Sequence, residues 1–513
     1  MIDDDAVATN DRVIAELART AGIYTHASRL VEVVDDADAS GSVRRHGAPR
    51  VHPIAAARLE ELISHHVDLR RRKISGDKTT YPKAQAPRGM AAQILARSTW
   101  PKVRHLVGII EAPTLRADGS LLDRRGYDSR SGLLLLYPSE LRVHVPAEPT
   151  REDGLDASKM LLELLRYFPA DSVARSAWLS ALLTAVARDA IDGPVPAVLF
   201  DANAPATGKG LLAGAIGIIS TGRPLPIAAW SSDADESRKL LLSIALSGDR
   251  MLLFDNLIDE LRSGELDAAL TSRSIRGRLL GFNAMVSAPF DALVIFTGNN
   301  VSIAGDLYRR ILYCRLKTAD EHPEQRELPD FLAHLQAHRG NLLGAALTIL
   351  RAYVVAGRPK QRLPPWGSFE RWSDLIRGAL KWLGLPDPAA ARDGLRARAD
   401  RDRERAEGLL IAWASYCRSY GFDNGQTIGK VRADLRAHPE SHTDLRAALE
   451  SLDAQMRQSP LGRGFAAIAD RVIGGMRLVQ DGKTGGAVRW KVESIVDQRD
   501  GFADEPPDGG LDP

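Results

Sequence analysis

Short apolar runs alternate with longer amphipathic segments between residues 196 and 320. The runs have the length of buried strands, and between them apolar residues recur at helical spacing. Strands that alternate with helices form parallel sheets. The pattern therefore predicts an α/β core with a parallel sheet. Its strands are expected at 197–200, 226–230, 251–254, 293–297 and 311–316, with helices that include 211–220 and 236–246.

Helical periodicity also flanks this core. Apolar residues recur at helical spacing over 158–188, which predicts a helical linker over 151–195. After the core, 331–355 and 369–383 show helical patterns, and the charged run 392–407 predicts an exposed helix that leads into one more domain.

Residues 1–150 mix short helical and extended patterns, which predicts a separate α+β domain. The segment includes a loop-rich stretch, 74–89, and a basic cluster that surrounds Tyr81. The cluster could follow a phosphate backbone with one stacking ring, or it could be a solvated loop, and the sequence leaves both readings open. Its members are Arg70, Arg71, Arg72, Lys73, Lys78, Lys83 and Arg88.

Composition narrows the class of protein. A chain of 513 residues exceeds one core and implies several domains of about 100–200 residues. The 68 Lys and Arg nearly balance the 66 Asp and Glu, so any basic face must be local. Cys314 and Cys417 are too few for a disulfide framework or a Cys-rich zinc site, which suits a reducing compartment, and both are expected to be small buried hydrophobes.

The two ends of the chain carry no signal for a membrane. The N-terminus is acidic and lacks an apolar leader, and no apolar run reaches the ~18 residues that a membrane helix needs. We therefore expect a cytoplasmic protein without a membrane partner. The last residues, 496–513, are rich in Asp, Pro and Gly and are expected to be a disordered acidic tail.

A phosphate loop follows the first strand of the core. Gly208 lets the backbone approach phosphate, and Lys209 would neutralise the β and γ phosphates of ATP. In the pattern Gly-x4-Gly-Lys-Ser/Thr, Asn203 replaces the first Gly and Gly210 replaces the hydroxyl residue that contacts Mg²⁺. Water or another group then completes the metal shell, or metal binding is weaker; an ordinary Gly-rich turn is the alternative. The expected ATP contacts are Ala204, Pro205, Ala206, Thr207, Gly208, Lys209, Gly210 and Leu211.

The strand at 251–254 ends in Asp255, which places a carboxylate beside the loop at the carboxyl edge of a parallel sheet. Asp255 is expected to hold Mg²⁺. Many ATPases have a water-activating Glu at the next position, where this chain has Asn256. The base is then Asp259 or Glu260, or Asn256 only orients the water.

The strand at 293–297 is followed by Asn299 and Asn300, whose amides could bind the attacking water or the γ phosphate, although paired Asn residues also mark turns. Arg309 and Arg310 come next. Either could stabilise phosphate charge in a neighbouring subunit, or both could be surface arginines paired with Asp306.

In this order, the motifs resemble the AAA+ core of superfamily 3 type helicases, particularly the replication helicases and primase-helicases of phages, prophages and integrative elements. The most specific matches are 206–212, 253–256, 269–272 with 278–281, and 297–300 with Asp306 and the Arg309–Arg310 pair. Segment 100–128 also resembles the domain that precedes the motor in those proteins.

The resemblance implies roles for residues. Lys209 would be the Walker A lysine and Asp255 the Walker B aspartate. Asn299 or Asn300 would be the sensor 1 residue, Arg309 or Arg310 the arginine finger, and Arg371 or Arg377 a second sensor. The stretch 272–290 would be a hairpin that grips single-stranded DNA, although a solvent-exposed basic loop would look the same. Its candidate phosphate contacts are Arg273, Arg276 and Arg278.

Residues 321–400 would form a helical lid, and 401–495 a winged helix. In the latter, two strands joined by a basic glycine-rich turn follow helices that could enter a DNA groove. Lys483 and Arg489 are the candidate DNA contacts. Such modules sometimes serve only as protein contacts, so that alternative stays open.

Together these features predict an ATP- and Mg²⁺-dependent DNA helicase or translocase that acts in replication of a mobile element. It would form a homo-oligomeric ring, a hexamer, on single-stranded or forked DNA, with a possible separate primase or polymerase. One alternative is a AAA+ ATPase that remodels protein, since fold does not determine substrate. Another is a DNA-binding initiator with weak turnover, motivated by Gly210 and Asn256. No acidic triad or zinc ligand set in residues 1–150 supports primase chemistry.

Overall fold

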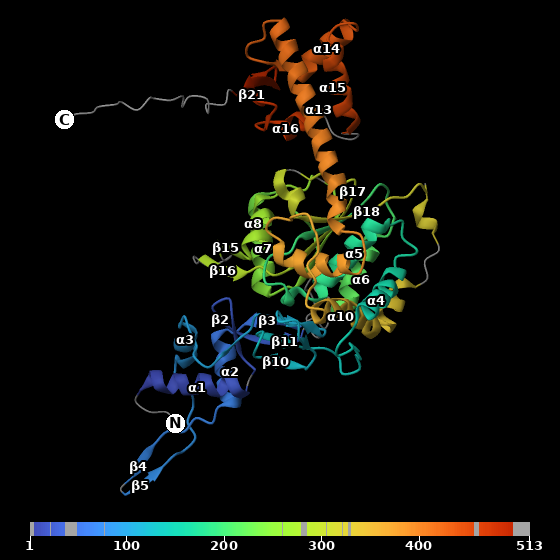
Figure 1. The fold of residues 1–513 in the computed structure, drawn as a ribbon. Helices are drawn as coiled ribbons and strands as arrows, with labels where there is room; N and C mark the ends of the chain where they lie inside the picture. The colour runs from blue at the N-terminus through green and yellow to red at the C-terminus, as the bar shows by residue number, and fades with distance from the viewer. Residues whose placement is uncertain are drawn as a thin grey trace, which may run out of the picture. The chain divides into compact units, whose positions relative to one another are not determined.

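The computed structural model of the chain divides into two compact units, Met1–Leu395 and Arg396–Pro513, and each is described by itself. Figure 1 shows the elements of both. The structure describes residues 5–20, 22–35, 49–75, 77–258, 260–278, 285–303, 305–320, 322–326, 330–455 and 461–495. The tail expected at 496–513 lies outside these residues.

A five-stranded parallel sheet forms the centre of the first unit. Its strand order is β13-β14-β17-β12-β18, which confirms the α/β core expected from the sequence. The pairing of β12 with β17 continues beyond the expected strand ends. Asp201 pairs with Gly298, and Ala202 pairs with Asn299. The strands are β12 (Ala197–Ala202), β13 (Ile227–Ala228), β14 (Met251–Leu257), β17 (Leu293–Asn299) and β18 (Ile311–Leu316).

Both faces of this sheet are covered by helices, so its strands are apolar on both sides. Val198 and Phe200 point into one core, whereas Leu199 between them points into the other, as the two-residue period of a strand requires. The first core contains helices α5 (Ser172–Val186), α6 (Lys209–Thr221) and α10 (Arg339–Val355), and the second contains α7 (Ala234–Ser247) and α8 (Gly264–Ser272).

The segment expected to be a helical linker contributes to the first core. α5 is buried on nearly all sides and is capped by Asp171, whose side chain accepts a hydrogen bond from the Ala174 N–H. The helices around it are α4 (Arg151–Glu163), α9 (Phe331–Ala337), α11 (Glu370–Trp372) and α12 (Gly378–Trp382), with a π-helical turn at Ser373–Arg377. The domain boundaries at 150, 195, 320 and 400 stay predictions.

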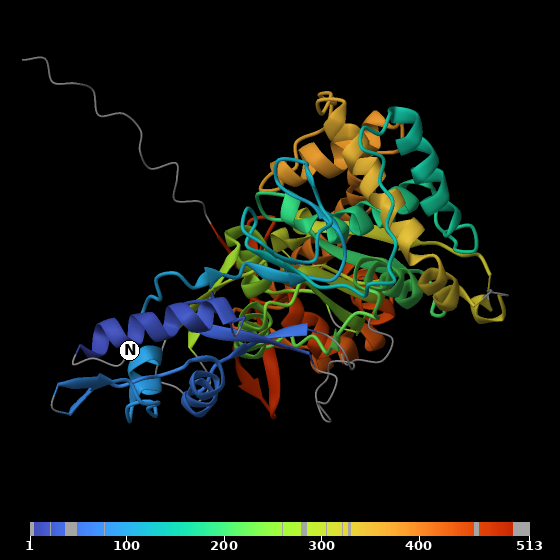
Figure 2. The same cartoon turned by 90° about the horizontal axis from the view of Figure 1, so that it is seen from below.

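The N-terminal part of this unit mixes helices with small sheets, and it forms the blue region of Figures 1 and 2. One sheet has the order β3-β2-β1-β6 and another β10-β11-β7. The helices are α1 (Ala6–Thr20), α2 (Ala56–His66) and α3 (Met90–Leu95). The strands of the two sheets are β1 (Tyr24–His26), β2 (Arg29–Asp35), β3 (Pro49–Pro53), β6 (Arg104–His105), β7 (Gly108–Ile110), β10 (Gly126–Asp128) and β11 (Leu133–Leu135).

Three strand pairs stand apart from these sheets. They are β4 (Lys73–Ser75) with β5 (Lys78–Thr80), β8 (Thr114–Leu115) with β9 (Leu121–Leu122), and β15 (Ser274–Arg278) with β16 (Met285–Pro289). The last pair is the hairpin that the resemblance implied, and its inner face packs on α7, where a Cβ at Gly277 would lie 2.9 Å from the Leu242 side chain.

The second unit packs helices against a four-stranded antiparallel sheet of order β19-β22-β21-β20. Trp413, Phe465 and Trp490 meet at its centre. Gly485 and Gly486 both have positive φ in the two-residue turn between the long strands, as a tight hairpin turn requires. The elements are α13 (Ala391–Ser419, which begins in the first unit), β19 (Gln426–Thr427), α14 (Ile428–Ala437), α15 (Thr443–Gln455), α16 (Leu461–Ile468), β20 (Val472–Ile473), β21 (Met476–Thr484) and β22 (Ala487–Ser494).

The two cysteines agree with the expectation from the sequence. Cys314 and Cys417 are both buried and unbridged. Among the residues that the structure describes, no helix combines the length and the apolar character needed to cross a membrane.

Candidate nucleotide site

The phosphate loop connects β12 to α6 at the carboxyl edge of the sheet. Gly208 precedes the helix with φ 97°, and a Cβ there would lie 2.5 Å from the ring of Phe168. Only glycine meets both constraints. The first N–H groups of α6 have no partner within the helix, so the loop ends at a helix terminus suited to an anion.

Asn203 stands where the usual pattern has its first Gly, and the structure gives it a role of its own. Its Nδ2 donates to the Thr318 carbonyl at 2.7 Å, and its Oδ1 accepts from the Thr318 N–H at 3.0 Å. The side-chain amide therefore fastens the start of the loop to the second residue after β18. A glycine could not make this connection.

Lys209 and Asn299 are brought together by the strand order. β17 lies between β12 and β14, so its last residue is beside the loop. Lys209 Nζ donates to Asn299 Oδ1 at 2.7 Å. Burial lowers the pKa of Lys209, while the carboxylates of Asp201 and Asp255 act in the opposite direction. Because Asn299 is neutral, its contact with Lys209 does not cancel the positive charge of the ammonium.

Asp255 and Asn256 lie in a β-bulge, where the register of β14 against β17 shifts. Thr297 Oγ1 donates to Asp255 Oδ1 at 2.5 Å and accepts from the Asn256 N–H at 2.8 Å. Asn256 has φ 58°, a region that Asn enters more readily than most residues. The bulge thus exposes both side chains at the sheet edge, as bulges beside active sites often do.

The identity of the water-activating base stays open. Glu260 is exposed just beyond this strand, and Asp259 lies outside the described residues. Sequence reasoning missed Thr297, although a hydroxyl residue that ends a wholly apolar strand was a usable signal.

A buried ionic network lies beneath the loop. The fully buried Asp201 carboxylate accepts from the Tyr313 hydroxyl at 2.6 Å, from the Arg315 guanidinium and from the Val301 N–H at 3.1 Å. Burial raises the pKa of Tyr313, which keeps it protonated as a donor. The network joins β12, β18 and the segment after β17, and the sequence pattern did not reveal it.

This network separates the two asparagines that the sequence could not distinguish. Asn300 Oδ1 accepts from Arg315 Nη2 at 2.8 Å, whereas Asn299 contacts Lys209. Asn300 also has φ 51° and donates its N–H to Ala202. The geometry therefore makes Asn299 the better sensor candidate and Asn300 part of its support.

Arg326 approaches the loop from the segment after β18, and sequence reasoning missed it. Its guanidinium lies over the Phe168 ring at 5.2 Å, and Nη2 donates to the Thr207 carbonyl at 3.4 Å. Burial lowers its pKa, opposed by Asp320. Within the part of the chain that the structure describes, its buried Nε has no hydrogen-bond partner. Arg326 thus brings a positive charge with unused donor capacity to the loop.

The two finger candidates differ in what they contact. Arg310 is bound to α8 of its own chain: it forms an ion pair with Asp267 at 2.7 Å and donates to the Thr271 hydroxyl at 3.4 Å. Arg309 is exposed and lies beside the ring of Tyr308. Arg309 is the more exposed of the two.

Neither second-sensor candidate reaches the loop. Arg377 is buried and bidentate to Asp387 at 2.9 and 2.6 Å, so it serves the helical region itself. The Arg371 side chain lies beside Gly193, which precedes β12 at the opposite edge of the sheet.

The basic residues of the β15–β16 hairpin also differ in exposure and in their partners. Arg276 and Arg278 are exposed on its outer face, but Arg273 forms ion pairs with Asp192 at 3.1 Å and Asp291 at 3.2 Å at its base. Residues 279–284 of the stretch expected to grip DNA lie outside the described residues.

Of the two candidate contacts in the second unit, Lys483 is exposed. Arg489 instead folds back to donate to the Asp481 carbonyl at 2.7 Å.

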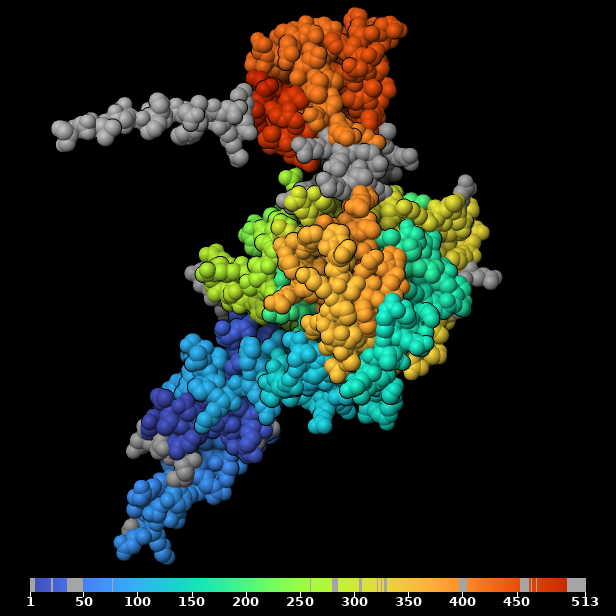
Figure 3. Space-filling model, in the orientation of Figure 1, coloured from blue at the N-terminus to red at the C-terminus, as the bar shows by residue number. Residues whose placement is uncertain are grey.

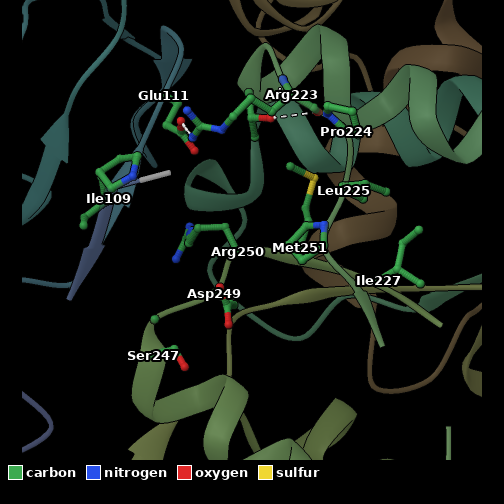
Figure 4. Close-up of a pocket in the computed structure, with 14 residues that line it drawn as sticks. Ile109, Glu111, Arg223, Pro224, Leu225, Ile227, Ser247, Asp249, Arg250 and Met251 are labelled. Carbon is green, nitrogen blue, oxygen red and sulfur yellow. Dashed lines mark hydrogen bonds and ion pairs between the residues drawn. The ribbon is translucent and has the colours of Figure 1, made fainter. Parts of the chain in front are cut away.

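A cavity of about 250 Å³ lies at the other edge of the sheet, away from the loop (Figure 4). Its wall joins the N-terminal part to the core through ion pairs, Glu111 with Arg223 and, nearby, Asp189 with Arg250. Because these charges neutralise one another, the cavity is better explained as a joint in the fold than as a nucleotide site.

No protein-family model matches the chain, and no curated protein matches it. Among solved structures, the A form apo structure of the NrS-1 C-terminal region is similar with a TM-score of 0.32 and 12% identity, over 84% of this chain and 94% of that one. SCCmec type IV Cch, described as an active helicase, is similar with a TM-score of 0.32 and 13% identity, over 92% of this chain and 97% of that one. Similarity at this level carries no argument, so the site is interpreted from its own residues.

Proposed function

We propose that the chain is an ATP-driven DNA helicase or translocase of the superfamily 3 type that acts in replication of a mobile element. The contact between Lys209 Nζ and Asn299 Oδ1 carries the proposal, because it joins a phosphate-loop cation to a neutral amide at the end of the neighbouring strand. Asp255 stands exposed on the strand beyond, held by Thr297. This set of groups suits a nucleoside triphosphate with a divalent cation.

In this proposal ATP phosphates bind at the amino end of α6, and Lys209 neutralises their charge. Asp255 holds Mg²⁺, which supplies further charge neutralisation. The residues fit this cation only in part, since Gly210 has no hydroxyl to offer. Asn299 orients the attacking water or the γ phosphate, and Thr297 positions Asp255.

We assign the arginine finger to Arg309, which requires a ring of subunits. Its exposure supports that role, because the charge must reach a neighbour's phosphate. The ion pair of Arg310 with Asp267 favours Arg309 over Arg310 for this role. The proposed assembly is a hexamer.

DNA would contact the β15–β16 hairpin through Arg276 and Arg278, with Arg273 holding the base of the hairpin in place. The second unit, as a winged helix, would contribute Lys483 from the end of β21, with Arg489 of β22 held at the Asp481 carbonyl. A separate primase or polymerase would supply the synthesis that replication needs.

Strand displacement on a forked DNA tests the proposal, with Lys209→Ala as the inactive control. We expect ATP-dependent displacement by the natural chain and none by the variant. ATP turnover that is indifferent to DNA, without displacement, would favour a protein-remodelling ATPase. Equal turnover by the two proteins would leave a DNA-binding initiator as the better description.

A further inference from the structure

A two-stranded ribbon, residues 69–84, projects from the N-terminal part of the first unit (Figures 1 and 3). β4 and β5 form its outer half. The pairing continues toward its base, where the Arg71 N–H donates to Pro82 and the Ala84 N–H donates to Leu69. Six residue steps of about 3.3 Å give the ribbon a length of about 20 Å.

Among the residues that the structure describes, no element pairs with or covers the ribbon. β4 and β5 form a sheet of their own, and the described residues from 70 to 83 are exposed. Ile74 is 62% exposed and Tyr81 45% exposed. An isolated two-stranded ribbon gains little stability from itself, so apolar groups on it indicate a surface that meets a partner.

Positive charge is concentrated here in a chain whose formal net charge is only +2. Asp77 is the one acid between residues 69 and 84, which also carry six Lys and Arg. Arg70 pairs with Asp68 at 2.9 Å. Among the described residues the other cations of the ribbon have no ion pair, unlike Lys159 and Arg166, which pair with acids one helical turn away. These cations are Arg71, Arg72, Lys73, Lys78 and Lys83.

The strand register distributes the charges over both faces. Lys73 lies opposite Thr80 and Ser75 opposite Lys78, which places Arg71, Lys73 and Lys78 on one face. Ile74 lies opposite Thr79, on the face that also carries Arg72, Tyr81 and Lys83.

We propose that this ribbon binds duplex DNA by entering its major groove. That groove is about 12 Å wide and admits a two-stranded ribbon. Cations on both faces then meet the phosphates of the two strands that border the groove, while Ile74 contacts base edges. Single-stranded DNA is a poorer fit, because its binding relies on several stacking rings and the ribbon has only Tyr81. The major groove of duplex RNA is too narrow.

The test measures binding of a short DNA duplex to the full chain without nucleotide, over a range of salt concentrations. The triple variant Arg71→Ala, Lys73→Ala, Lys78→Ala is compared with Lys159→Ala, Arg166→Ala, Lys360→Ala, which removes equal charge elsewhere. We expect the first to bind at least about 10-fold more weakly, with a salt slope smaller by about 0.9 for each phosphate that the variant no longer neutralises. Equal affinity and slope in the two variants would overturn the proposal.

A second variant and two other ligands test the groove itself. Ile74→Ser should weaken duplex DNA binding and leave the salt slope unchanged, whereas unchanged affinity would argue against groove insertion. The weaker binding of the triple variant should be confined to duplex DNA; an equal weakening for single-stranded DNA or duplex RNA would reveal a general polyanion surface instead. Because ATP is absent, failure of strand displacement would not affect these results. Equal melting temperatures of all variants establish that they fold.

Discussion

Both edges of the central sheet carry charged side chains, but the partners of these side chains differ between the edges. At the amino edge Arg188, 5% exposed, meets Asp291 at 2.8 Å, and Arg250 meets Asp189. At the carboxyl edge the groups that face the loop have neutral partners: Lys209 an amide, Asp255 a hydroxyl. Arg326 has an aromatic ring and a carbonyl.

This difference separates structural charges from charges kept for a ligand. A buried ion pair satisfies both members and leaves little net field. A charge held by a neutral group keeps its field, and in a water-poor site that field acts strongly on phosphate. Asp201 with Arg315, beneath the loop, belongs to the first kind although it lies at the second edge. The partner, rather than the position, therefore identifies a functional charge.

The same substitution at the two edges should have opposite consequences, and this is the largest effect expected. Asp255→Asn should lower the turnover number by at least about 100-fold, because it weakens the group that holds Mg²⁺. Asp189→Asn should keep turnover within twofold and lower the melting temperature instead, since Arg250 loses its charged partner. Steady-state ATP hydrolysis gives the turnover numbers, and thermal unfolding gives the melting temperatures. If Asp255→Asn lowered the melting temperature as much as Asp189→Asn does, the two edges would not differ in the way proposed.

Arg188→Met tests the ion pairs at the amino edge alone. It removes a buried cation from Asp291, whose remaining ion-pair partner among the described residues is Arg273 at 3.2 Å. We expect destabilisation of about 3 kcal/mol, seen as a lower melting temperature, with normal nucleotide affinity at a temperature where the variant is folded. Reduced affinity in the folded variant would contradict a purely structural role.

Arg326→Ala should weaken nucleotide binding by about 10-fold, the worth of one charge-assisted contact. A fluorescent ATP analogue reports the dissociation constant. Arg166→Ala is the matched control, because Arg166 is an exposed arginine near Phe168 that pairs with Glu163. Similar constants in both variants would show that Arg326 only packs on Phe168.

The smallest expected effect is an increase in the apparent affinity for Mg²⁺. A Cβ at Gly210 would have nothing within 4 Å, so Gly210→Ser fits without displacing its surroundings. The hydroxyl should lower the Mg²⁺ concentration for half-maximal hydrolysis by about threefold, under 1 kcal/mol. Gly214→Ser, on the same helix with equally open space, controls for the effect of serine on helix stability. An equal decrease in the Mg²⁺ requirement of both variants would show that the metal does not bind beside residue 210.

The sequence pattern predicted the strands and the loop because they depend on local apolar periodicity. The strand at 311–316 has the expected limits. β12, β14 and β17 extend two or three residues beyond their expected ends, whereas β13 is shorter than expected. Asp255, Lys209 and Asn299 lie at one sheet edge because parallel strands end together.

The partner of each arginine could not be predicted in this way. Arg273, Arg310, Arg377 and Arg489 were all candidates for ligand contacts, and each is bound within its own chain. Periodicity reports which face of an element is buried, but it carries no information about which distant carboxylate or carbonyl meets a cation. Arg326 was missed for the same reason, since its approach to the loop depends on where the chain goes after β18.

The Asn203 amide and the Thr318 backbone are 115 residues apart in the chain. This separation has a kinetic meaning, because closing so long a segment is entropically costly and must await the last strand of the sheet. A growing polypeptide that ends before β18 has every residue of the phosphate loop but not the anchor that shapes it. Nucleotide affinity should therefore appear late in folding, only after the whole sheet has assembled.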